Sequence, residues 1–455
     1  MTNAELELER SAVSRQWATV TAGLLLSSMI LLIVDPEWSV RAVSGVGLAV
    51  ALMSLIAVGS SIEGGFWSIP QTCLLTLCIF HAGALVEFLH SDTPAFLGGQ
   101  RLLRMPEMPT AVYLSSVGIS AFATFAILGY PKDRKESSSP SDVQVRQSVS
   151  VVGGVTLVLG CALWFGFARR AGLGVGSNYS DYLESVSGTP VPLFYQLINL
   201  ALPLAMVRYR TRLNLLVWLV YCLFAVVAFP LGLRGEVLFP AVVAAAVIGL
   251  QRPMPSWRQS TAVVLLLLVP IAVVAQTRLT AEQRSTTSIS VDPLRGVYEM
   301  GGTLYVVAET VRWHQTEEEP FYHGRTYVAP LRDSGKRFVL RDKNYDPSRD
   351  MDYMATQVIT RVGYFGGSVI AEAYDNFGRT GVIAVMALFG AALGRLSGRA
   401  KGSAGALFGA IAAAVMFQQL VRNAFESAPV LALLSLILWL LSLGVAAVQR
   451  TLKAT

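Results

Sequence analysis

Charged residues are scarce in this sequence: Asp, Glu, Lys and Arg make up 15% of its 455 positions. Soluble domains carry roughly a quarter charged residues, so the scarcity argues against an ordinary soluble enzyme. Hydrophobic residues fill 53% of the positions, and the mean hydropathy is +0.52. These values predict an integral membrane protein. The net charge of +6 would suit a soluble nucleic-acid-binding domain, but in a membrane protein the placement of charge matters more, and we expect no nucleic-acid partner.

Cysteine and clustered acidic residues are also scarce. The four cysteines all lie within apolar segments: Cys73, Cys78, Cys161 and Cys222. This placement argues against a disulfide framework or a zinc site and favours small core residues. Asp35 and Glu37, in the first predicted outer turn, faintly resemble the acidic residues of metal-dependent polyprenyl-phosphate-sugar transferases. A structural role in the turn is the more common one, so we expect no essential metal and no cofactor.

Long polar segments are rare as well, because apolar segments of about the length needed to cross a bilayer fill most of the chain. The first of them follows a polar stretch without the pattern of a cleavable signal peptide, so we expect it to stay in place. The sequence therefore predicts an all-α polytopic membrane protein with about twelve transmembrane helices. The predicted spans lie at about 17–34, 40–59, 69–88, 110–130, 148–168, 191–207, 213–231, 236–250, 260–276, 380–395, 402–420 and 428–448.

The distribution of Lys and Arg predicts the orientation, because short cytoplasmic loops are enriched in these residues. With both termini inside, the cytoplasmic segments hold 16 of the 36 Lys and Arg, and the short outer loops hold seven. The other 13 lie in one long polar segment, and long loops translocate largely regardless of charge. We divide the chain into spans at 1–276, a large extracytoplasmic loop at 277–380, and spans with a cytoplasmic tail at 381–455. A serine-rich cytoplasmic linker at 131–147 reads as disordered.

The long loop contains one helical pattern and one unusual apolar segment. Apolar residues recur at three- and four-residue spacing from Leu294 to Val311, which predicts an amphipathic helix along the membrane surface. The segment from Arg361 to Gly378 is apolar, with glycines and isolated polar groups. Such a composition is typical of a chain that re-enters the edge of the membrane where protein shelters its polar atoms.

Three short segments together resemble a known family. They are GLRGEVLFP from Gly232 to Pro240, FYHGRTYVAPLRD from Phe321 to Asp333, and GGSVIAEAYDNFGRTG from Gly366 to Gly381. In this order they resemble the arginine-bearing junction, the G-x-[ST]-Y segment and the C-terminal signature of the oligosaccharide repeat unit polymerases, the Wzy-type O-antigen polymerases. Arg422-Asn423 stands where a further outer-face arginine would be expected, although its surroundings match poorly.

The resemblance implies a membrane glycosyltransferase of the bacterial inner membrane, and it allows a GT-C-like architecture. Such polymerases move a growing glycan from one undecaprenyl pyrophosphate onto another lipid-linked repeat unit, and so build an O-antigen or capsule type of polysaccharide. The implied partners are the undecaprenyl-pyrophosphate-linked oligosaccharide, membrane lipids, a flippase and a chain-length regulator.

Arginine suits the pyrophosphate of the donor, because its planar fork binds phosphate oxygens bidentately and stays charged. Arg234 is the first candidate, since its glycine neighbours leave room for a ligand; a snorkelling arginine at the interface is the alternative. Arg361 and Arg422 lie on the same predicted face, and ordinary loop packing or a pair with Glu426 are their alternatives. Glu372, in apolar surroundings, is the candidate base near the acceptor hydroxyl, against a carboxylate that merely neutralises an arginine.

The remaining candidates are expected to contact the substrate. His314 and His323 are rival bases, although a lone loop histidine is more often a surface residue. Tyr364 and Tyr374 have the shape to stack on sugar, but aromatic residues near interfaces are also common anchors. The full set of predicted substrate-binding residues is Glu236, His323, Arg325, Tyr327, Tyr364, Ser368, Tyr374 and Asn376.

Two other functions compete with polymerisation. A flippase or other transporter of lipid-linked oligosaccharide should place charges at mid-membrane depth and have short loops. Here the centres of the predicted spans carry few charges and one outer loop is long, which favours chemistry at the outer face. A ligase that uses the same donor with another acceptor is not separated from a polymerase by the sequence.

Overall fold

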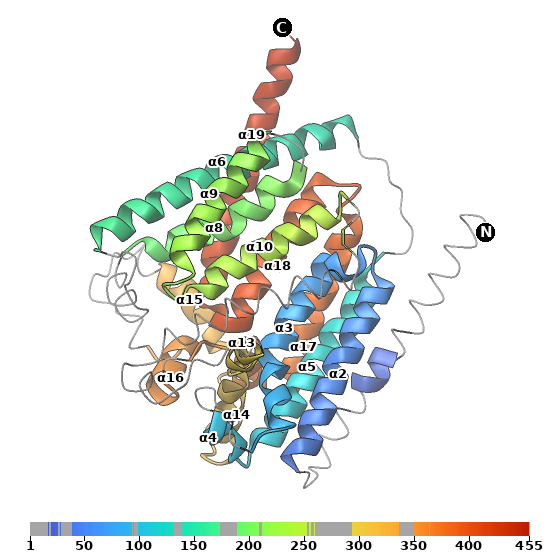
Figure 1. Cartoon of the computed structure of the whole chain (residues 1–455), viewed down its shortest axis with the longest axis vertical. Helices are drawn as coiled ribbons and strands as arrows, with labels where there is room; N and C mark the ends of the chain where they lie inside the picture. Colours follow the sequence, from blue (N-terminus) through green and yellow to red (C-terminus); the bar gives the residue numbers. More distant parts are fainter. Residues whose placement is uncertain are drawn as a thin grey trace, which may run out of the picture.

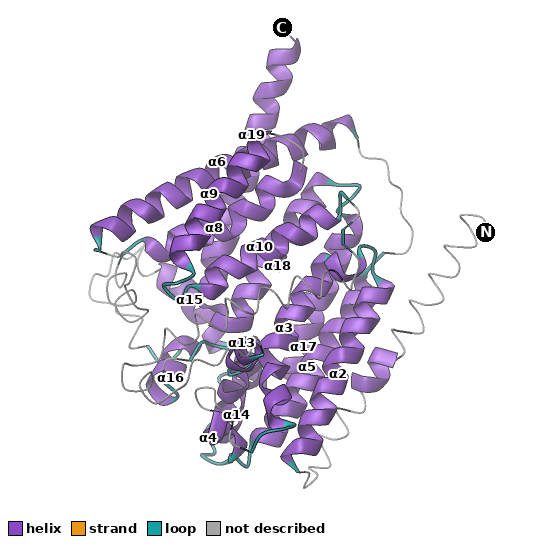
Figure 2. Ribbon diagram, in the orientation of Figure 1, coloured by secondary structure: helices purple, strands orange, loops and turns teal. Residues whose placement is uncertain are grey.

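The computed structural model describes residues 17, 20–25, 28, 39–92, 94, 99–131, 139–172, 189–208, 212–252, 254–255, 259, 294–335, 350–363 and 365–454. These residues form helices joined by turns, and no strand occurs among them (Figures 1 and 2). The all-α expectation is confirmed for this part of the chain. Asp35, Glu37 and Tyr364 lie outside the described residues.

Eight helices of the described part are long and apolar enough to cross a membrane. They are α2 (Val40–Ser61), α3 (Ile69–Phe88), α5 (Met108–Gly129), α6 (Pro140–Arg170), α8 (Val191–Ala205) with the short turn η2 (Met206–Arg208), α17 (Val369–Arg399), α18 (Ala404–Asn423) and α19 (Ala428–Ala454). Two further apolar helices are shorter, α9 (Arg212–Ala228) and α10 (Arg234–Gly249). These ten match ten of the twelve predicted spans. The predicted spans at 17–34 and 260–276 fall largely outside the described residues, so the total of twelve stays a prediction.

The helices α2, α3, α5 and α17 run side by side in one part of the bundle, and α6, α8, α9 and α10 lie together in the other (Figure 1). Small residues allow the closest of these contacts. Gly390 and Gly394 of α17 lie against the backbone of Phe122 and Ala126 in α5, where a Cβ atom would clash. Glycine has no Cβ, so the two helices approach until their backbones touch.

The prediction of a disordered linker at 131–147 is wrong from Pro140 onward, because α6 begins there. Residues 132–138 lie outside the described part of the protein. Ser139 caps the helix by accepting a hydrogen bond from the backbone N–H of Asp142 at 3.2 Å, and proline suits the first helical position. Arg146 then donates to the backbone carbonyls of Ala400 and Lys401 at 2.7 and 2.6 Å. The first turns of α6 are therefore anchored to the connection between α17 and α18.

Five short helices form a cap over one end of the bundle, where α3 ends and α5 begins. These cap helices are α4 (Gly99–Leu103), α13 (Arg295–Met300), α14 (Thr303–Gln315), α15 (Arg325–Gly335) and α16 (Met354–Arg361). In Figure 1 α4, α13, α14 and α16 lie in the lower half of the view, away from the C terminus at the top.

The amphipathic helix predicted from Leu294 to Val311 is wrong in two respects. It is two helices, α13 and α14, separated at Gly301 and Gly302, and α14 is buried rather than spread along a surface. Gly301 packs directly on the backbone of Ala84 in α3, which a larger residue would prevent. The chain therefore turns into the bundle at this point.

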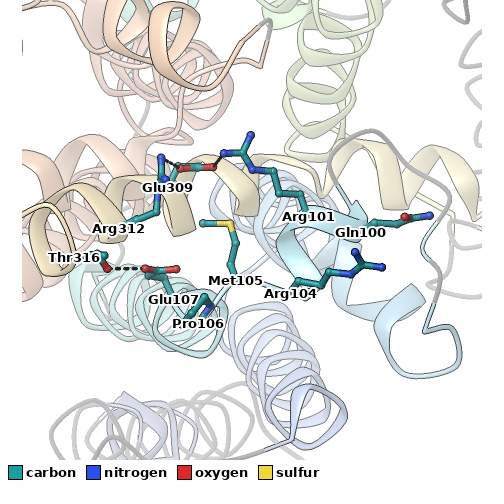
Figure 3. Close-up of a pocket in the computed structure, with 9 residues that line it drawn as sticks. All are labelled: Gln100, Arg101, Arg104, Met105, Pro106, Glu107, Glu309, Arg312 and Thr316. Carbon is teal, nitrogen blue, oxygen red and sulfur yellow. Dashed lines mark hydrogen bonds and ion pairs between the residues drawn. The ribbon is translucent and has the colours of Figure 1, made fainter.

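Ion pairs make the burial of α14 possible. Glu309 has no exposed surface, and its carboxylate lies 3.1 Å from Arg101 of α4 and 2.7 Å from Arg312 (Figure 3). A buried charge without a partner is strongly unfavourable, so the two arginines allow this face of α14 to be covered. Arg101 is more than two hundred positions from Glu309 in the sequence, which is why the helical pattern alone did not reveal the burial.

The helix α17 is two helices joined at Gly378, whose φ of 66° and ψ of −154° are not helical. The first part, residues 369–377, does not continue the span but turns back into the bundle. Ile370 lies against Gly118 in the middle of α5, and Ser368 contacts His81 in the second half of α3. The segment therefore packs inside the helical bundle, and its return into the edge of the membrane stays a prediction. We call residues 365–377 the re-entrant segment.

Candidate functional site

Two of the predicted arginines meet at the cap end of the bundle. Arg234 begins α10 and Arg422 lies in the last turn of α18. The residue between them is Gly235, where a Cβ atom would lie only 2.5 Å from Nη1 of Arg422. A side chain at this position would push the flexible Arg422 guanidinium away, so glycine allows it to lie where it does. The glycine next to Arg234, singled out from the sequence, makes room for a second arginine.

The guanidinium of Arg234 is buried but only partly satisfied. Its residue is 6% exposed, and Nη1 donates to Oε2 of Glu299 at 3.1 Å. Its Nε and Nη2 are buried without an acceptor in the described part of the protein. A buried donor without an acceptor is costly, and a guanidinium offers five donors in a fixed fork. The arrangement therefore favours an anionic ligand between Arg234 and Arg422.

Glu236 completes this cluster on the side of Arg422. Its Oε2 lies 3.7 Å from Nη1 of Arg422, which is an ion pair but too long for a hydrogen bond. The carboxylate therefore has weaker contacts than the other acidic groups of the site. Gly366, at the start of the re-entrant segment, packs on the backbone and side chain of Arg422, so this segment borders the cluster. The site that we describe below as the arginine cluster consists of Arg234, Glu236, Glu299 and Arg422.

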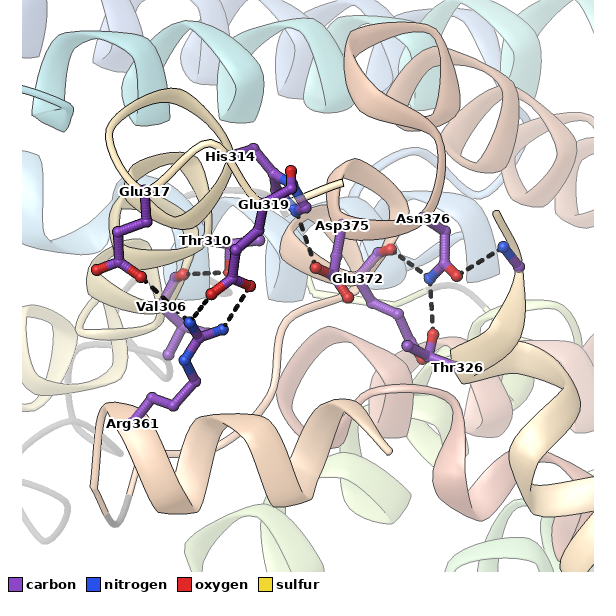
Figure 4. Close-up of polar contacts among 11 residues, drawn as sticks. Val306, Thr310, His314, Glu317, Glu319, Thr326, Arg361, Glu372, Asp375 and Asn376 are labelled. Atoms are coloured by element: carbon purple, nitrogen blue, oxygen red, sulfur yellow. Dashed lines mark hydrogen bonds and ion pairs between the residues drawn. The ribbon is translucent and has the colours of Figure 1, made fainter. Parts of the chain in front are cut away.

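Arg361 is held elsewhere. Its guanidinium donates to Glu319 at 2.9 Å and to Glu317 at 3.1 Å, and it lies over the Trp313 ring (Figure 4). The hydrogen bonds to Glu319 raise the pKa of Arg361, which keeps it charged. Its recorded contacts are therefore with α14 and the turn after it, and the structure does not bring it into the arginine cluster.

Glu372 lies in the re-entrant segment with both carboxylate oxygens occupied. Oε1 accepts from the hydroxyl of Thr326 and Oε2 from the backbone N–H of Phe425, each at 2.7 Å, and the residue is 2% exposed. These bonds tie α15 and the chain before α19 to the re-entrant segment. In this arrangement the carboxylate positions its neighbours, and neither oxygen is turned toward an open site.

Asn376 joins two of the segments that carry the family resemblance. Its side-chain amide donates to Thr326 at 2.6 Å and to the backbone carbonyl of Glu372 at 2.8 Å, and it accepts from the N–H of Gly324 at 2.8 Å (Figure 4). The backbone N–H of His323 also donates to the Asn376 carbonyl at 2.9 Å. The segment from Phe321 to Asp333 is thus docked on the re-entrant segment through its first residues.

The other predicted contacts in this segment divide into exposed and packed side chains. His323 and Arg325 are exposed, which leaves them accessible to a glycan. Tyr327 packs between the rings of Phe377 and Phe425, at centroid distances of 6.1 and 5.1 Å. Burial raises the pKa of its phenol. Tyr327 therefore serves the packing between α15 and the re-entrant segment.

His314 is bound by acceptors on both ring nitrogens. Nδ1 lies 2.8 Å from the backbone carbonyl of Glu319, and Nε2 lies 2.9 Å from Oδ1 of Asp375 (Figure 4). A carbonyl and a carboxylate both accept, so this arrangement favours an imidazole with a proton on each nitrogen, which is the charged form. Burial lowers the pKa of His314, but the hydrogen bonds to Asp375 and Glu319 outweigh it, and the pKa is raised. In this state His314 is no base, and it holds the turn after α14 to the re-entrant segment.

The residues of the arginine cluster and of the re-entrant segment all fall within a match to a known protein family. A scan against protein-family models matched residues 112–454 to the O-antigen polysaccharide polymerase Wzy. The chain belongs to the O-antigen polysaccharide polymerase Wzy family. The resemblance inferred from three short segments is thus confirmed over most of the chain. A search of curated proteins and a search of solved structures each found no match.

Membership of the Wzy family makes the chain a multi-pass membrane protein of polysaccharide biosynthesis, of a glycosyltransferase-type polymerase family. The arginine cluster, the re-entrant segment and α14 to α16 all lie within the matched residues. Two of the segments that carried the resemblance pack on each other, and the third reaches them through the contact of Gly235 with Arg422. The family pattern therefore marks a single region of the fold.

Ser368 has a buried partner that the sequence analysis missed. His81, in α3, places Nε2 2.8 Å from the Ser368 hydroxyl, and its Nδ1 lies 3.1 Å from the carbonyl of Leu77. The carbonyl requires the proton on Nδ1, so Nε2 accepts from Ser368. Neither residue has exposed surface. A histidine inside an apolar span was the available signal, because polar residues at that depth are often functional.

The remaining predictions concern aromatic, cysteine and metal-binding residues. Tyr374 is buried, with its ring 5.7 Å from those of His314 and Phe321. Three of the cysteines are buried, but Cys222 is exposed on α9, so it is not a core residue as predicted. Among the described residues, no group of three or more His, Cys, Asp or Glu side chains has an arrangement suited to a metal ion.

Proposed function

We propose that this protein polymerises undecaprenyl-pyrophosphate-linked oligosaccharide repeat units by glycosyl transfer. The observation that carries the proposal is the buried Arg234, with two donors lacking an acceptor, directly beside Arg422. Two adjacent guanidinium groups suit a diphosphate better than a neutral or singly charged ligand. The contact of Arg422 with Glu236 is long, at 3.7 Å, so Arg422 is also poised to exchange this carboxylate for a ligand.

The chemistry of transfer assigns the arginines a role in the transition state. As the bond between the anomeric carbon and the donor pyrophosphate breaks, negative charge grows on the departing phosphate oxygen. Arg234 and Arg422 stabilise this charge, and preorganised donors of this kind are usually the largest catalytic contribution. An acceptor hydroxyl forms the new glycosidic bond to the same carbon and loses its proton to a base. The products are the elongated glycan on one lipid and the undecaprenyl diphosphate.

Glu236 is the carboxylate that we propose as the base. It lies beside the arginines, its side chain is 24% exposed, and its ion pair with Arg422 is long. Glu372 was the first choice from the sequence, but its two oxygens each accept a short hydrogen bond. We therefore assign Glu372 a positioning role, through the re-entrant segment that borders Arg422.

The direction of the protein in the membrane follows from charge placement. Arg146 joins the start of α6 to the connection between α17 and α18, and Trp67 joins the loop after α2 to the residues after α10. The ion pair of Lys401 with Glu63 links these two pairs, so the four segments share one end of the bundle. These are segments that the Lys and Arg distribution assigns to the cytoplasm. The arginine cluster and the loop at 277–380 then face the outside of the inner membrane, where a flippase delivers repeat units and a chain-length regulator acts.

One experiment tests the proposed function. The purified protein in a bilayer receives an undecaprenyl-pyrophosphate-linked repeat unit, and the products are resolved by gel electrophoresis and mass spectrometry. A ladder of multiples of the repeat unit is expected. Transfer only to a lipid core acceptor would show a ligase, and movement across vesicles without longer glycans would show a flippase. Either of these outcomes overturns the proposal.

A further inference from the structure

A second charged cavity lies in the cap, away from the arginine cluster. It is an open cavity with a volume of about 550 Å³, bordered by α4, the residues before α5 and α14. Three arginines line it, Arg101 and Arg104 from α4 and the turn after it and Arg312 from α14, together with Gln100 (Figure 3). The volume falls within the range of roughly 300–1,000 Å³ that is typical of small-molecule sites.

The carboxylates of this cavity are already engaged. Glu309 binds Arg101 and Arg312, at 3.1 and 2.7 Å, and it has no exposed surface. Glu107 accepts a hydrogen bond from the hydroxyl of Thr316 at 2.7 Å. Both acidic groups therefore hold the walls together, and the buried Glu309 fixes two of the three guanidinium groups in place.

Positive charge remains after these pairs are counted. Arg104 is exposed, and no ion pair is recorded for it among the described residues. The Nε of Arg312 is buried without an acceptor in the same part of the protein. Arginine donors left without acceptors around one cavity favour a ligand with a carboxylate or phosphate group, which accepts two hydrogen bonds from one guanidinium.

We propose that this cavity is a subsite for a glycan bearing an acidic sugar, whose carboxylate or phosphate group binds Arg104. The inference rests on the proposed function, since it takes the ligand to be the glycan that is being extended. The site would hold a sugar at a distance from the bond that forms, and so select repeat units that carry negative charge.

The position of the cavity favours a glycan over a lipid headgroup. Pro106 and Glu107 line it, and they precede the apolar helix α5, while α4 follows the end of α3. The cavity is thus built from residues between spans. The ring of Tyr305 on α14 lies 5.5 Å from the Arg101 guanidinium and 5.0 Å from the ring of Phe365 in the re-entrant segment. Tyr305 of α14 therefore contacts both an arginine of the cavity and the segment that borders Arg422.

Equilibrium binding tests the subsite without any turnover. The full-length protein in phosphatidylcholine nanodiscs is titrated with fluorescent tetragalacturonate, and with maltotetraose as the uncharged control. We expect the acidic probe to bind and the neutral one not to bind, with affinity that falls as salt increases. Arg104→Gln should weaken binding by roughly tenfold or more, as expected for losing a hydrogen bond to a charged group.

Two controls make the result specific. Arg169→Gln removes the same charge from an exposed arginine of α6 and should leave binding unchanged. Thermal unfolding of Arg104→Gln checks that the fold is intact, and Gln100→Ala supplies a second, uncharged change in the lining. Wild-type binding by Arg104→Gln, or equal binding of the two probes, overturns the proposal. Competition by phosphatidylglycerol in the nanodisc would show a headgroup site and overturns it too.

The experiments distinguish an error in the proposed subsite from an error in the proposed polymerase function. The titration is repeated in Arg422→Gln, where we expect tetragalacturonate to bind as before although polymerisation is lost. Loss of binding in this variant would show that the probe occupies the arginine cluster, and that the cavity is no separate subsite. A normal ladder from Arg104→Gln with a neutral repeat unit would leave the polymerase proposal standing on its own evidence.

Discussion

The imidazole of His81 accepts a hydrogen bond from the Ser368 hydroxyl, with 2.8 Å between Nε2 and Oγ. This bond joins the second half of α3 to the residue that precedes the re-entrant helix at 369–377. Ser368 also caps that helix by accepting from the N–H of Ala371 at 3.1 Å. The buried Ser368 hydroxyl thus fixes how deeply the helix that carries Glu372 lies in the bundle. It also fixes the residue at which that helix begins.

Replacing His81 tests this connection. His81→Leu leaves the Ser368 hydroxyl buried without an acceptor, which should lower the free energy of unfolding by about 1–3 kcal/mol and reduce polymerisation. Ser368→Ala added to His81→Leu should recover part of the loss, because the unsatisfied hydroxyl is gone. Thermal unfolding of both single variants and the double variant measures the coupling. Strictly additive effects would contradict it, and exposed His90→Leu serves as the control.

Arginine geometry in the cluster should matter more than charge. Arg234→Lys and Arg422→Lys keep a positive charge but lose the bidentate fork, so we expect polymerisation rates to fall by about a hundredfold or more. Rates of ladder formation measure the effect. Arg41→Lys, at an exposed ion pair with Asp92, is the matched control and should be unchanged. Wild-type activity in Arg234→Lys would remove Arg234 from the catalytic residues.

Glu236 and Glu372 should respond differently to replacement by glutamine. Glu236→Gln removes the proposed base, so we expect the rate to fall about a hundred- to ten-thousand-fold while thermal stability changes little. Glu372→Gln replaces one accepting oxygen with a donor, which should lower stability by about 1–3 kcal/mol. Rates over a range of pH and thermal unfolding separate the two effects. If Glu236→Gln keeps the wild-type rate and pH profile, Glu236 is not the base.

Stability should depend on pH through His314. Its folded pKa lies above the unfolded value of about 6.5, because Asp375 and the Glu319 carbonyl bind the protonated ring. The stabilisation is therefore full below about pH 6.5 and is lost as the pH rises through the raised folded value. Thermal unfolding across this window measures it, and His314→Gln should remove this part of the dependence. If the stability of His314→Gln depends on pH as that of the wild type does, the ion pair of His314 with Asp375 is not the cause of this dependence.

Chelation should not stop polymerisation. Two guanidinium groups at the diphosphate supply the charge that a divalent ion supplies in many phosphate enzymes, so we expect the same ladder with and without EDTA. Added magnesium should likewise have no effect on the rate. An activity that disappears with EDTA and returns with a divalent ion would show that the arginines do not suffice.

Much of the fold could be predicted, because apolar segments of sufficient length report directly on span position. Ten predicted segments are helices, and the re-entrant return followed from glycines and isolated polar groups in an apolar run. Arg234 and Arg422 lie at the ends of apolar segments on one predicted face, so their meeting was also foreseeable.

Contacts between distant residues could not be predicted. Arg101 neutralises Glu309 from a separate segment, and without that pair α14 reads as a surface helix. Glu372 appeared to be an isolated acid, because its donors come from Thr326 and from the backbone of Phe425. Hydrophobic periodicity reports on which face of a helix is apolar, but it does not reveal which neutralising partner comes from elsewhere.

The turn at Gly378 also bears on how the protein is made. A translocon releases one continuous apolar helix at a time, but residues 369–377 are too short to span the bilayer and double back beside the helix that follows. Their partners include Phe425, which is synthesised after α18. The re-entrant helix therefore reaches its final place only after α18 and Phe425 have been made, so the site should be assembled late in biogenesis. Truncation before α18 should leave a chain that inserts but has no site.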